Sequence, residues 1–248
     1  FNPYGYTGFY FDLTPHLKDG GNVLAVRVRN EGITSRWYPG SGIYRNVWLT
    51  ETAPTHIRPW GIWAKTISAD KKKAKLEVDV ELEGDLTGTS IKLAVLDADG
   101  KTVAERTKEA AESTTTFELS VSNPKLWDVD TPHLHTAHAE VIQGGKVIDS
   151  FEQTFGIRTI KFTPENGFEL NGKMVNMIGG CVHHDNGLIG AMAPARADIR
   201  KMEIMKREGY NAVRASHNPM TTDFYAACDR LGLLVLDEVF DVWGVHKT

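Results

Sequence analysis

Apolar and polar residues alternate along much of the chain between Phe9 and Phe162, a period of two that is typical of half-buried β-strands. Two short runs, residues 9–13 and 24–28, flank the turn signal Asp19-Gly20-Gly21-Asn22. They predict half of an antiparallel sandwich within residues 1–53. The first run has no earlier strand with which to pair, so we expect further residues before Phe1. The apolar positions of the two runs are Phe9, Phe11, Leu13, Leu24, Val26 and Val28.

A second set of alternating runs follows Pro54 and predicts an immunoglobulin-like β-sandwich over residues 54–162. Turn signals at Asp99-Gly100 and Gly144-Gly145 separate the runs. The histidines of this region, at i, i+2 and i+5, cannot share one face of a strand, so we predict no metal site there. The clearest runs are Leu76 to Leu82, Ile91 to Val95 and Phe117 to Val121, and the histidines are His133, His135 and His138.

After Phe162 the pattern changes to short apolar runs that alternate with stripes of helical period, which predicts β-α units. A hairpin with an Asn171-Gly172 turn comes first. Only three units precede Thr248, whereas a (β/α)8 barrel takes about 250 residues, so residues 163–248 predict an incomplete TIM barrel. The predicted strands begin at Met174, Asn211 and Gly232, and the helical stripes are Ala195, Ile199, Met202 and Met205 before Gly209, and Phe224, Cys228 and Leu231 before Gly232.

Each of these three apolar runs ends in polar residues that can take part in chemistry. In a parallel barrel the active site lies at the carboxyl ends of the strands, so these polar clusters are the site candidates. The clusters are His183-His184-Asp185, then Arg214 with Ser216-His217-Asn218, and finally Asp237-Glu238.

The stretch from Asn211 to Glu238 resembles the signature of glycoside hydrolase family 2, which contains β-galactosidases, β-glucuronidases and β-mannosidases. Gly180 to Asp185 is similar to the preceding strand of that family, and Phe155 to Phe162 is similar to the end of its sandwich domain. The resemblance implies three parts. They are the C-terminal part of a sugar-binding jelly roll (1–53), an immunoglobulin-like sandwich (54–162) and the first units of the catalytic barrel (163–248).

The resemblance also implies roles for the polar clusters. His184, His217 and Asn218 would bind substrate hydroxyls. Neighbours on a strand point to opposite faces, so only one of His183 and His184 is expected to enter the pocket, and the alignment with the family motif selects His184. Arg214 lies within an apolar strand, where a guanidinium needs a carboxylate partner, so we expect it to orient an acid.

Asp237 and Glu238 are adjacent and diverge, so we predict supporting roles for them rather than a catalytic couple. In the family the acid/base and nucleophile glutamates lie on later strands. This chain therefore has no catalytic glutamate by that comparison, and alone it should be inactive.

The loop from Ser35 to Trp48 carries aromatic and cationic residues, which suit the stacking and hydrogen bonding of a sugar. The alternative is that Trp37 and Tyr38 seal a domain interface. The family's jelly roll has a similar Ser-Gly-Ile-Tyr-Arg stretch facing its active site, which favours substrate binding by Arg36, Trp37 and Tyr38. Arg36 stands where well-known β-galactosidases have an acid, so the hydroxyl specificity can differ and an anionic substrate is favoured by its charge.

Composition and charge give no support for two classes of binding partner, nucleic acids and membranes. With 41% hydrophobic residues and a net charge of −4, the sequence has no basic footprint for nucleic acid and no apolar run that spans a membrane. We predict a soluble chain whose compartment the sequence does not reveal. Cys181 and Cys228 lie in apolar contexts without metal-ligand spacing and are predicted to be buried thiols.

No cofactor is predicted. Some family members use magnesium or sodium, but their ligands follow the Asp-Glu pair, where Asp241-Val242-Trp243 does not match. A metal hydrolase using His183, His184 and His217 would need all three to converge, which adjacent histidines disfavour.

The sequence thus predicts a retaining glycoside hydrolase acting on terminal β-linked sugars, a β-galactosidase first. The alternatives are a β-glucuronidase or β-mannosidase of the same family, or a non-catalytic carbohydrate-binding protein. The expected partners are a glycoside or oligosaccharide and the remainder of the same polypeptide, and a homo-oligomer is left open.

Overall fold

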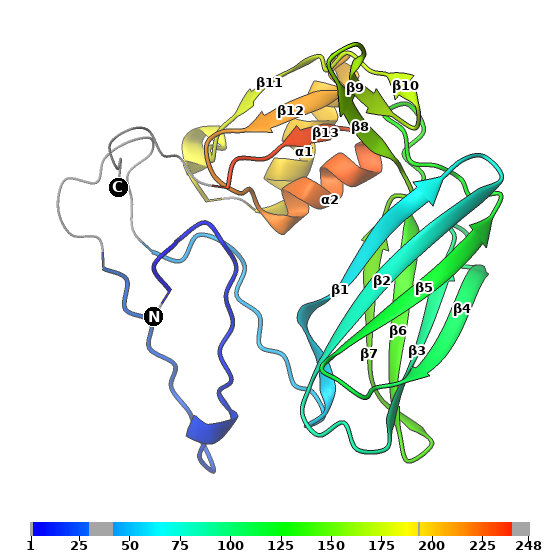
Figure 1. The fold of residues 1–248 in the computed structure, drawn as a ribbon. Coiled ribbons are helices and arrows are strands. Elements are labelled where there is room, and N and C mark those ends of the chain that lie inside the picture. The colour runs from blue at the N-terminus through cyan, green and yellow to red at the C-terminus, as the bar shows by residue number, and fades with distance from the viewer. Residues whose placement is uncertain (1, 30–41, 193, 240–248) are drawn as a thin grey trace. The chain divides into compact units, whose positions relative to one another are not determined.

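The computed structural model describes residues 2–29, 42–192 and 194–239. The chain divides into two compact units, which are described separately below (Figure 1). One unit consists of Phe1–Trp48, Gly179–Ala227 and Val235–Thr248, and the other of Leu49–Ile178 with Cys228–Leu234. The domain boundaries predicted from the sequence stay predictions.

The larger unit contains the β-sandwich that the alternating pattern predicts. One antiparallel sheet has the strand order β1-β2-β5 and the other β4-β3-β6-β7 (Figure 1). The strands are β1 His56–Ala69, β2 Lys73–Glu83, β3 Thr89–Leu96, β4 Thr102–Glu109, β5 Thr114–Ser122, β6 His135–Gln143 and β7 Lys146–Phe155.

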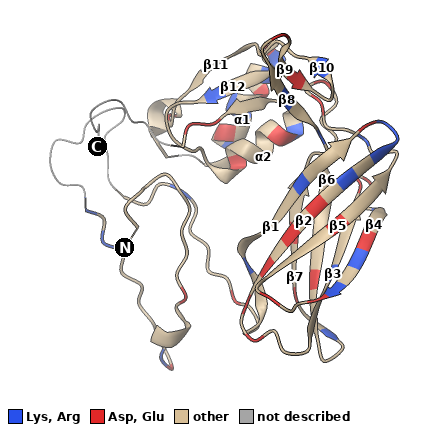
Figure 2. Cartoon of the chain, viewed as in Figure 1, with Lys and Arg blue, Asp and Glu red and all other residues tan. Residues whose placement is uncertain are grey.

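The core of the sandwich follows directly from the alternation. Strand β2 pairs with β5 so that Val78 lies opposite Phe117, and both side chains are fully buried. Burying one such side chain stabilises the fold by about 1.5–3 kcal/mol. The intervening positions are polar, and Figure 2 shows Lys and Arg interspersed with Asp and Glu along the strands of both sheets.

A short antiparallel meander, in the order β10-β9-β8, follows the sandwich. Its turn is the predicted Asn171-Gly172 pair, in which both residues adopt the positive φ that a type I′ turn requires. The Asn171 side chain donates to the Trp127 carbonyl at 3.0 Å, which attaches the meander to the end of the sandwich. The strands are β8 Ile160–Thr163, β9 Gly167–Leu170 and β10 Lys173–Met174.

The other unit contains a three-stranded sheet in the order β11-β12-β13, with β11 parallel to β12. Helices α1 and α2 follow β11 and β12, which confirms the β-α alternation and the start of a barrel domain. The first strand begins later than predicted, because Met174 pairs with Glu169 in the meander and only the chain from Gly179 joins the parallel sheet. The elements are β11 Gly179–Val182, α1 Ala195–Arg207, β12 Ala212–Ala215, α2 Thr222–Leu231 and β13 Leu234–Leu236.

The predicted strand pair within residues 9–28 is wrong. The described residues before Thr55 contain a 3₁₀ helix, Thr14–His16, and no β-strand. Phe11 and Leu24 are 62% and 66% exposed, because no second layer covers this segment in the described chain. An isolated two-stranded ribbon without a covered apolar face is marginal in water, so alternation alone does not fix a strand here.

Candidate active site

The site candidates follow the carboxyl ends of three neighbouring strands. In the β11–β12 ladder the last residue pair is Val182 with Ala215. The next residues, His183 and Ser216, therefore leave the two strands at the same end of the sheet. Asp237 and Glu238 follow β13 at the adjacent position. The predicted convergence of the three polar clusters at one edge of this sheet is therefore observed, since His183 meets His217 and His217 meets Glu238.

Glu238 is the centre of this cluster. Arg214 Nε donates to its Oε1 at 2.7 Å, and Arg214 Nη2 contacts the same oxygen. His217 Nδ1 donates to Oε2 at 2.7 Å. Burial alone would raise the pKa of Glu238, but the hydrogen bonds from His217 and Arg214 outweigh it and lower that pKa. Arg214 thus orients an acid, as its place in an apolar strand predicts, and Glu238 stays ionised.

Arg214 also contacts the first strand. Its Nη1 lies 3.5 Å from the Sγ of Cys181, which is its ladder partner on β11. Cys228 is buried as predicted, but Cys181 is exposed. The prediction of a buried thiol was wrong for Cys181, because its side chain lies on the sheet face that carries Arg214 and not among apolar neighbours.

The adjacent histidines lie in different surroundings. The ring of His183 meets the ring of His217 edge to face, with 5.5 Å between the centroids. Burial, followed by the neighbouring His217, lowers the pKa of His183. The structure therefore brings His183 toward the Glu238 cluster, a position that sequence reasoning missed by choosing only His184.

His184 contacts the loop after β12. Its Nε2 donates to the carbonyl of Asn218 at 3.2 Å, and its ring packs against Tyr6 with the centroids 4.9 Å apart. Burial first, and then the charge of Arg45, lower the pKa of His184 to about 4. The imidazole is neutral at pH 7, so Nδ1 is a hydrogen-bond acceptor suited to a hydroxyl.

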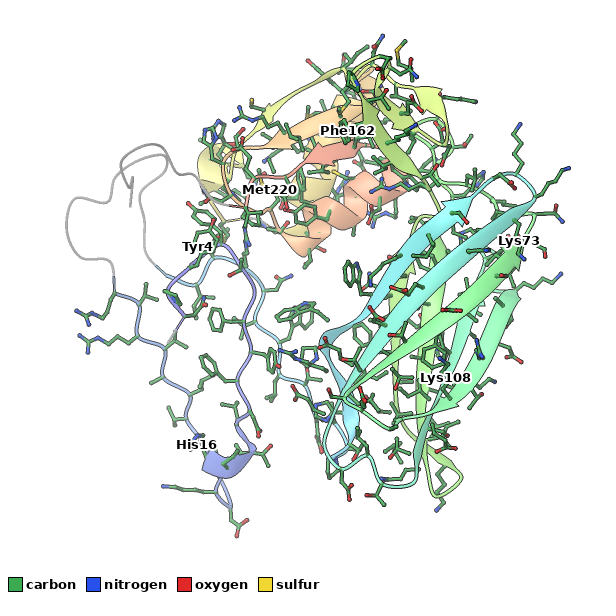
Figure 3. All side chains as sticks on the ribbon, in the orientation of Figure 1. Tyr4, His16, Lys73, Lys108, Phe162 and Met220 are labelled. Carbon is green, nitrogen blue, oxygen red and sulfur yellow. The ribbon has the colours of Figure 1, made fainter. Side chains whose placement is uncertain are left out.

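Three residues of the N-terminal segment complete this side of the site. Tyr4, which is labelled in Figure 3, donates to the side-chain oxygen of Asn218 at 2.6 Å. Arg45 Nη2 donates to the Pro219 carbonyl at 2.7 Å, and Arg45 Nη1 donates to the Tyr6 carbonyl. Sequence reasoning did not select Tyr4 or Tyr6. Arg45 could have been selected from the sequence, since it ends the Ser-Gly-Ile-Tyr-Arg stretch that resembles the family's jelly roll.

Asp237 has a different partner from Glu238. Tyr225 donates its hydroxyl hydrogen to Asp237 Oδ1 at 2.8 Å and accepts one from the backbone N–H of Met220 at 2.9 Å. Burial, followed by the hydrogen bond to Asp237, raises the pKa of Tyr225. The two adjacent carboxylates thus diverge, as expected.

Several predicted residues cannot be placed. Arg36, Trp37, Tyr38 and the segment Asp241-Val242-Trp243 lie outside the described residues. Within the described ranges, no group of three or more His, Cys, Asp and Glu side chains is arranged to hold a metal ion. His183 and His217 meet each other, whereas His184 is bound to Asn218. Over the same ranges, no helix has the length and apolarity to cross a membrane.

Two family models match the chain consecutively. Residues 55–158 match glycosyl hydrolases family 2, and residues 162–245 match the TIM barrel domain of glycosyl hydrolases family 2. The chain belongs to glycosyl hydrolase family 2. Its sandwich and its parallel sheet are therefore the immunoglobulin-like domain and the start of the barrel of this family, as predicted.

The chain is similar to several family 2 proteins. It is 43% identical to the beta-galactosidase BoGH2A of Bacteroides ovatus, over 99% of this chain and 30% of that protein. A family 2 crystal structure from Bacteroides cellulosilyticus has a TM-score of 0.81 at 43% identity, over 87% of this chain and 31% of that one. A Bifidobacterium dentium beta-glucuronidase, complexed with coumarin-3-O-glucuronide, has a TM-score of 0.70 at 28% identity, over 75% of this chain and 31% of that one. The chain thus spans less than a third of the length of these relatives.

Proposed function

We propose that this chain is part of a retaining β-glycosidase that hydrolyses terminal β-linked sugars, a β-galactosidase first. The observation that carries the proposal is the cluster in which Glu238 is held by both Arg214 and His217 at the carboxyl edge of a family 2 barrel sheet. The two hydrogen-bond donors fix the orientation of the Glu238 carboxylate, and the histidine and asparagine groups beside it suit sugar hydroxyls.

In this proposal His184, His217 and Asn218 bind substrate hydroxyls. A neutral imidazole whose Nε2–H is bound to a backbone carbonyl presents Nδ1 as an acceptor, which is the arrangement at His184. Such contacts accelerate the reaction when they strengthen in the oxocarbenium-like transition state. Arg214, Asp237 and Glu238 support the site by fixing the neighbouring strands.

Glu238 is poorly suited to be the general acid. An acid must hold a proton near neutral pH, and the two donors on Glu238 lower its pKa instead. Retaining glycosidases also need two carboxyl groups about 5–5.5 Å apart on either side of the scissile bond. Asp237 is bound to Tyr225 and shares no hydrogen-bond partner with Glu238 among the residues that the structure describes. We therefore assign the acid/base and nucleophile to glutamates outside this chain.

Of the two described guanidinium groups at the site, only Arg214 is paired with a carboxylate. Arg214 is paired with Glu238, and Arg45 donates to the carbonyl groups of Tyr6 and Pro219. Arg45 keeps its charge, because its partners are neutral carbonyl groups, and its buried Nε has no hydrogen-bond partner among the described residues. The similarity to a glucuronide-binding relative keeps β-glucuronidase as the alternative, with Arg36 as the cation that would serve it.

The test is hydrolysis of nitrophenyl β-galactoside, β-glucuronide and β-mannoside by the longer polypeptide that contains this chain. We expect cleavage of the β-galactoside with a first product of retained configuration, followed by proton NMR of the anomeric signals. Cleavage of the glucuronide alone would identify the alternative. Sugar binding without cleavage of any substrate would replace the enzyme by a carbohydrate-binding protein.

A further inference from the structure

The first turn of α1 carries a buried carboxylate. Asp198 is 5% exposed and lies one turn before Met202, which is also buried. An ionised group in such a position is costly unless hydrogen bonds replace its water. Here the Thr221 hydroxyl donates to Oδ2 at 2.6 Å, and the Asn186 side-chain amide donates to Oδ1 at 3.5 Å. Both oxygens of the Asp198 carboxylate are therefore committed to residues of other segments.

Lys201 stands three residues further along the same helix. Its Nζ lies 3.8 Å from Oδ1 of Asp198, so the two side chains form an ion pair within α1. The ammonium also donates to the carbonyl of Asp185 at 2.6 Å and to that of His183 at 3.4 Å. Lys201 thus holds the backbone on both sides of His184.

Asp198 in turn contacts the loop that follows β12. Thr221, whose hydroxyl donates to Asp198, accepts the backbone N–H of Phe224 at 3.1 Å and so caps the start of α2. The residues just before Thr221 are the loop that carries His217 and Asn218. A single ion pair on α1 therefore contacts the two loops that follow β11 and β12.

We propose that Asp198 and Lys201 are positioning residues of the active site, which set the placement of His184 and of the His217–Asn218 loop without touching the substrate. The inference rests on the proposed function of that site. A displacement of about 1 Å in a substrate-binding group can lower the rate by about 100-fold, so the rigidity of this bridge matters to catalysis.

The same helix offers a matched control. Arg196 and Glu203 form an ion pair at 2.8 Å on α1, but their side chains are 67% and 44% exposed. Removing either should alter helix stability slightly and leave both loops in place, because an exposed ion pair contributes little. Arg196→Met and Glu203→Gln therefore report what the loss of an α1 charge does when no loop is attached to it.

The experiment compares variants of the longer polypeptide with the nitrophenyl substrate that it hydrolyses. Lys201→Met should lower kcat/KM by about 10- to 100-fold at a temperature where the protein is fully folded, and Lys201→Arg should recover most of the loss. The Arg196→Met and Glu203→Gln variants should stay within about two-fold of the wild type. A Lys201→Met enzyme with unchanged kcat/KM would overturn the proposal.

A double substitution separates positioning from general destabilisation. If Lys201 acts through His184, adding Lys201→Met to a His184→Ala background should lower kcat/KM by less than about three-fold, since the effects of coupled residues do not add. An undiminished loss in that background would show that Lys201 acts elsewhere.

Hydrogen exchange tests the same inference without activity. Lys201→Met should speed amide exchange of residues 183–190, and Glu203→Gln should not. If no substrate is cleaved, the proposed function fails and this comparison still decides whether Lys201 fixes the loop. Unchanged exchange in Lys201→Met would contradict the positioning role.

Discussion

His217 and Glu238 meet across two neighbouring strand ends, with Nδ1 of His217 2.7 Å from Oε2 of Glu238. The other carboxylate oxygen is held by Arg214, which belongs to the same strand β12 that leads to His217. The carboxylate thus ties the residues after β13 to β12 and to the loop that follows β12. A carboxylate that accepts from a guanidinium and an imidazole resists rotation, which fixes His217 at the edge of the sheet.

Glu238→Gln should therefore impair catalysis more than folding. The amide oxygen can accept from only one of the two donors with the same geometry, and the amide NH₂ faces the other donor. We expect kcat/KM of the longer polypeptide to fall by about 10- to 100-fold with the thermal midpoint shifted by only a few degrees. Glu203→Gln, which makes the same chemical change on an exposed face of α1, is the control. Equal kinetics for the two variants would refute the role assigned to Glu238.

Some parts of this fold could be predicted from sequence because local rules and tertiary contacts agree there. Alternation in β2 and β5 matches a covered face, and the polar residues after each barrel strand match its carboxyl end. The strand pair predicted in residues 9–28 fails because nothing in the described chain covers its apolar side. Periodicity reports which residues prefer burial, but not whether a second layer is present.

The candidate site could likewise be predicted from the sequence only in part. Arg214 could be matched to an acid because a strand guanidinium needs a partner, although the sequence did not identify which acid. The contacts of Tyr4 and Arg45 with the 218–219 loop span 214 and 174 residues of sequence. No local pattern encodes such distant pairings. Strand geometry predicted that only one of His183 and His184 enters the pocket, and the family motif selected His184. The chain has already left β11 at these residues, so both meet site residues.

The site should make the chain sensitive to acid through His184. Its pKa in the folded chain is about 4, against 6.5 for an unperturbed imidazole. The unfolded state therefore binds a proton first, so this contribution to stability is fully present above about pH 6.5 and is lost as the pH falls toward about 4. Because the ring is partly exposed, about 3 kcal/mol is an upper limit for the effect.

Thermal midpoints of the 248-residue chain at pH 7.5 and pH 5.0 would measure it, with His184→Gln as the comparison. The variant lacks the titrating group, so its midpoint should fall less between the two pH values than that of the parent chain. Parallel decreases in the two proteins would mean that other groups account for the acid sensitivity.

The 248-residue chain alone should not hydrolyse any of the three nitrophenyl substrates. Its described carboxylates at the strand ends are bound to Arg214, His217 and Tyr225, and family resemblance places the catalytic glutamates beyond Thr248. Purified chain and a Glu238→Gln version should give the same background rate, while circular dichroism checks that both retain the β-sandwich. Hydrolysis by the parent chain above that of the variant would contradict the assignment of catalysis to residues elsewhere.

The two barrel helices end in glycines that allow a matched test of packing. Gly209 and Gly232 follow α1 and α2 with φ of +91° and +73°, a region in which other residues are strained. A Cβ at Gly209 would meet nothing within 4 Å, whereas one at Gly232 would lie 2.3 Å from the Val129 carbonyl oxygen. Gly209→Ala should thus cost only the backbone strain, about 1 kcal/mol.

Gly232→Ala adds a clash with a backbone atom that cannot rotate away, so we expect a loss of unfolding free energy at least about 2 kcal/mol greater than for Gly209→Ala. Urea unfolding of the two variants beside the parent chain measures the difference. Trp127 provides a local signal, since its indole N–H donates to the Asp229 carbonyl at 2.7 Å in the last turn of α2 and its fluorescence should change when that turn moves. Equal losses for the two variants would show that the backbone at Val129 and Gly232 can shift apart with no loss of unfolding free energy. The close packing of the end of α2 on the Trp127 segment would then contribute nothing to stability.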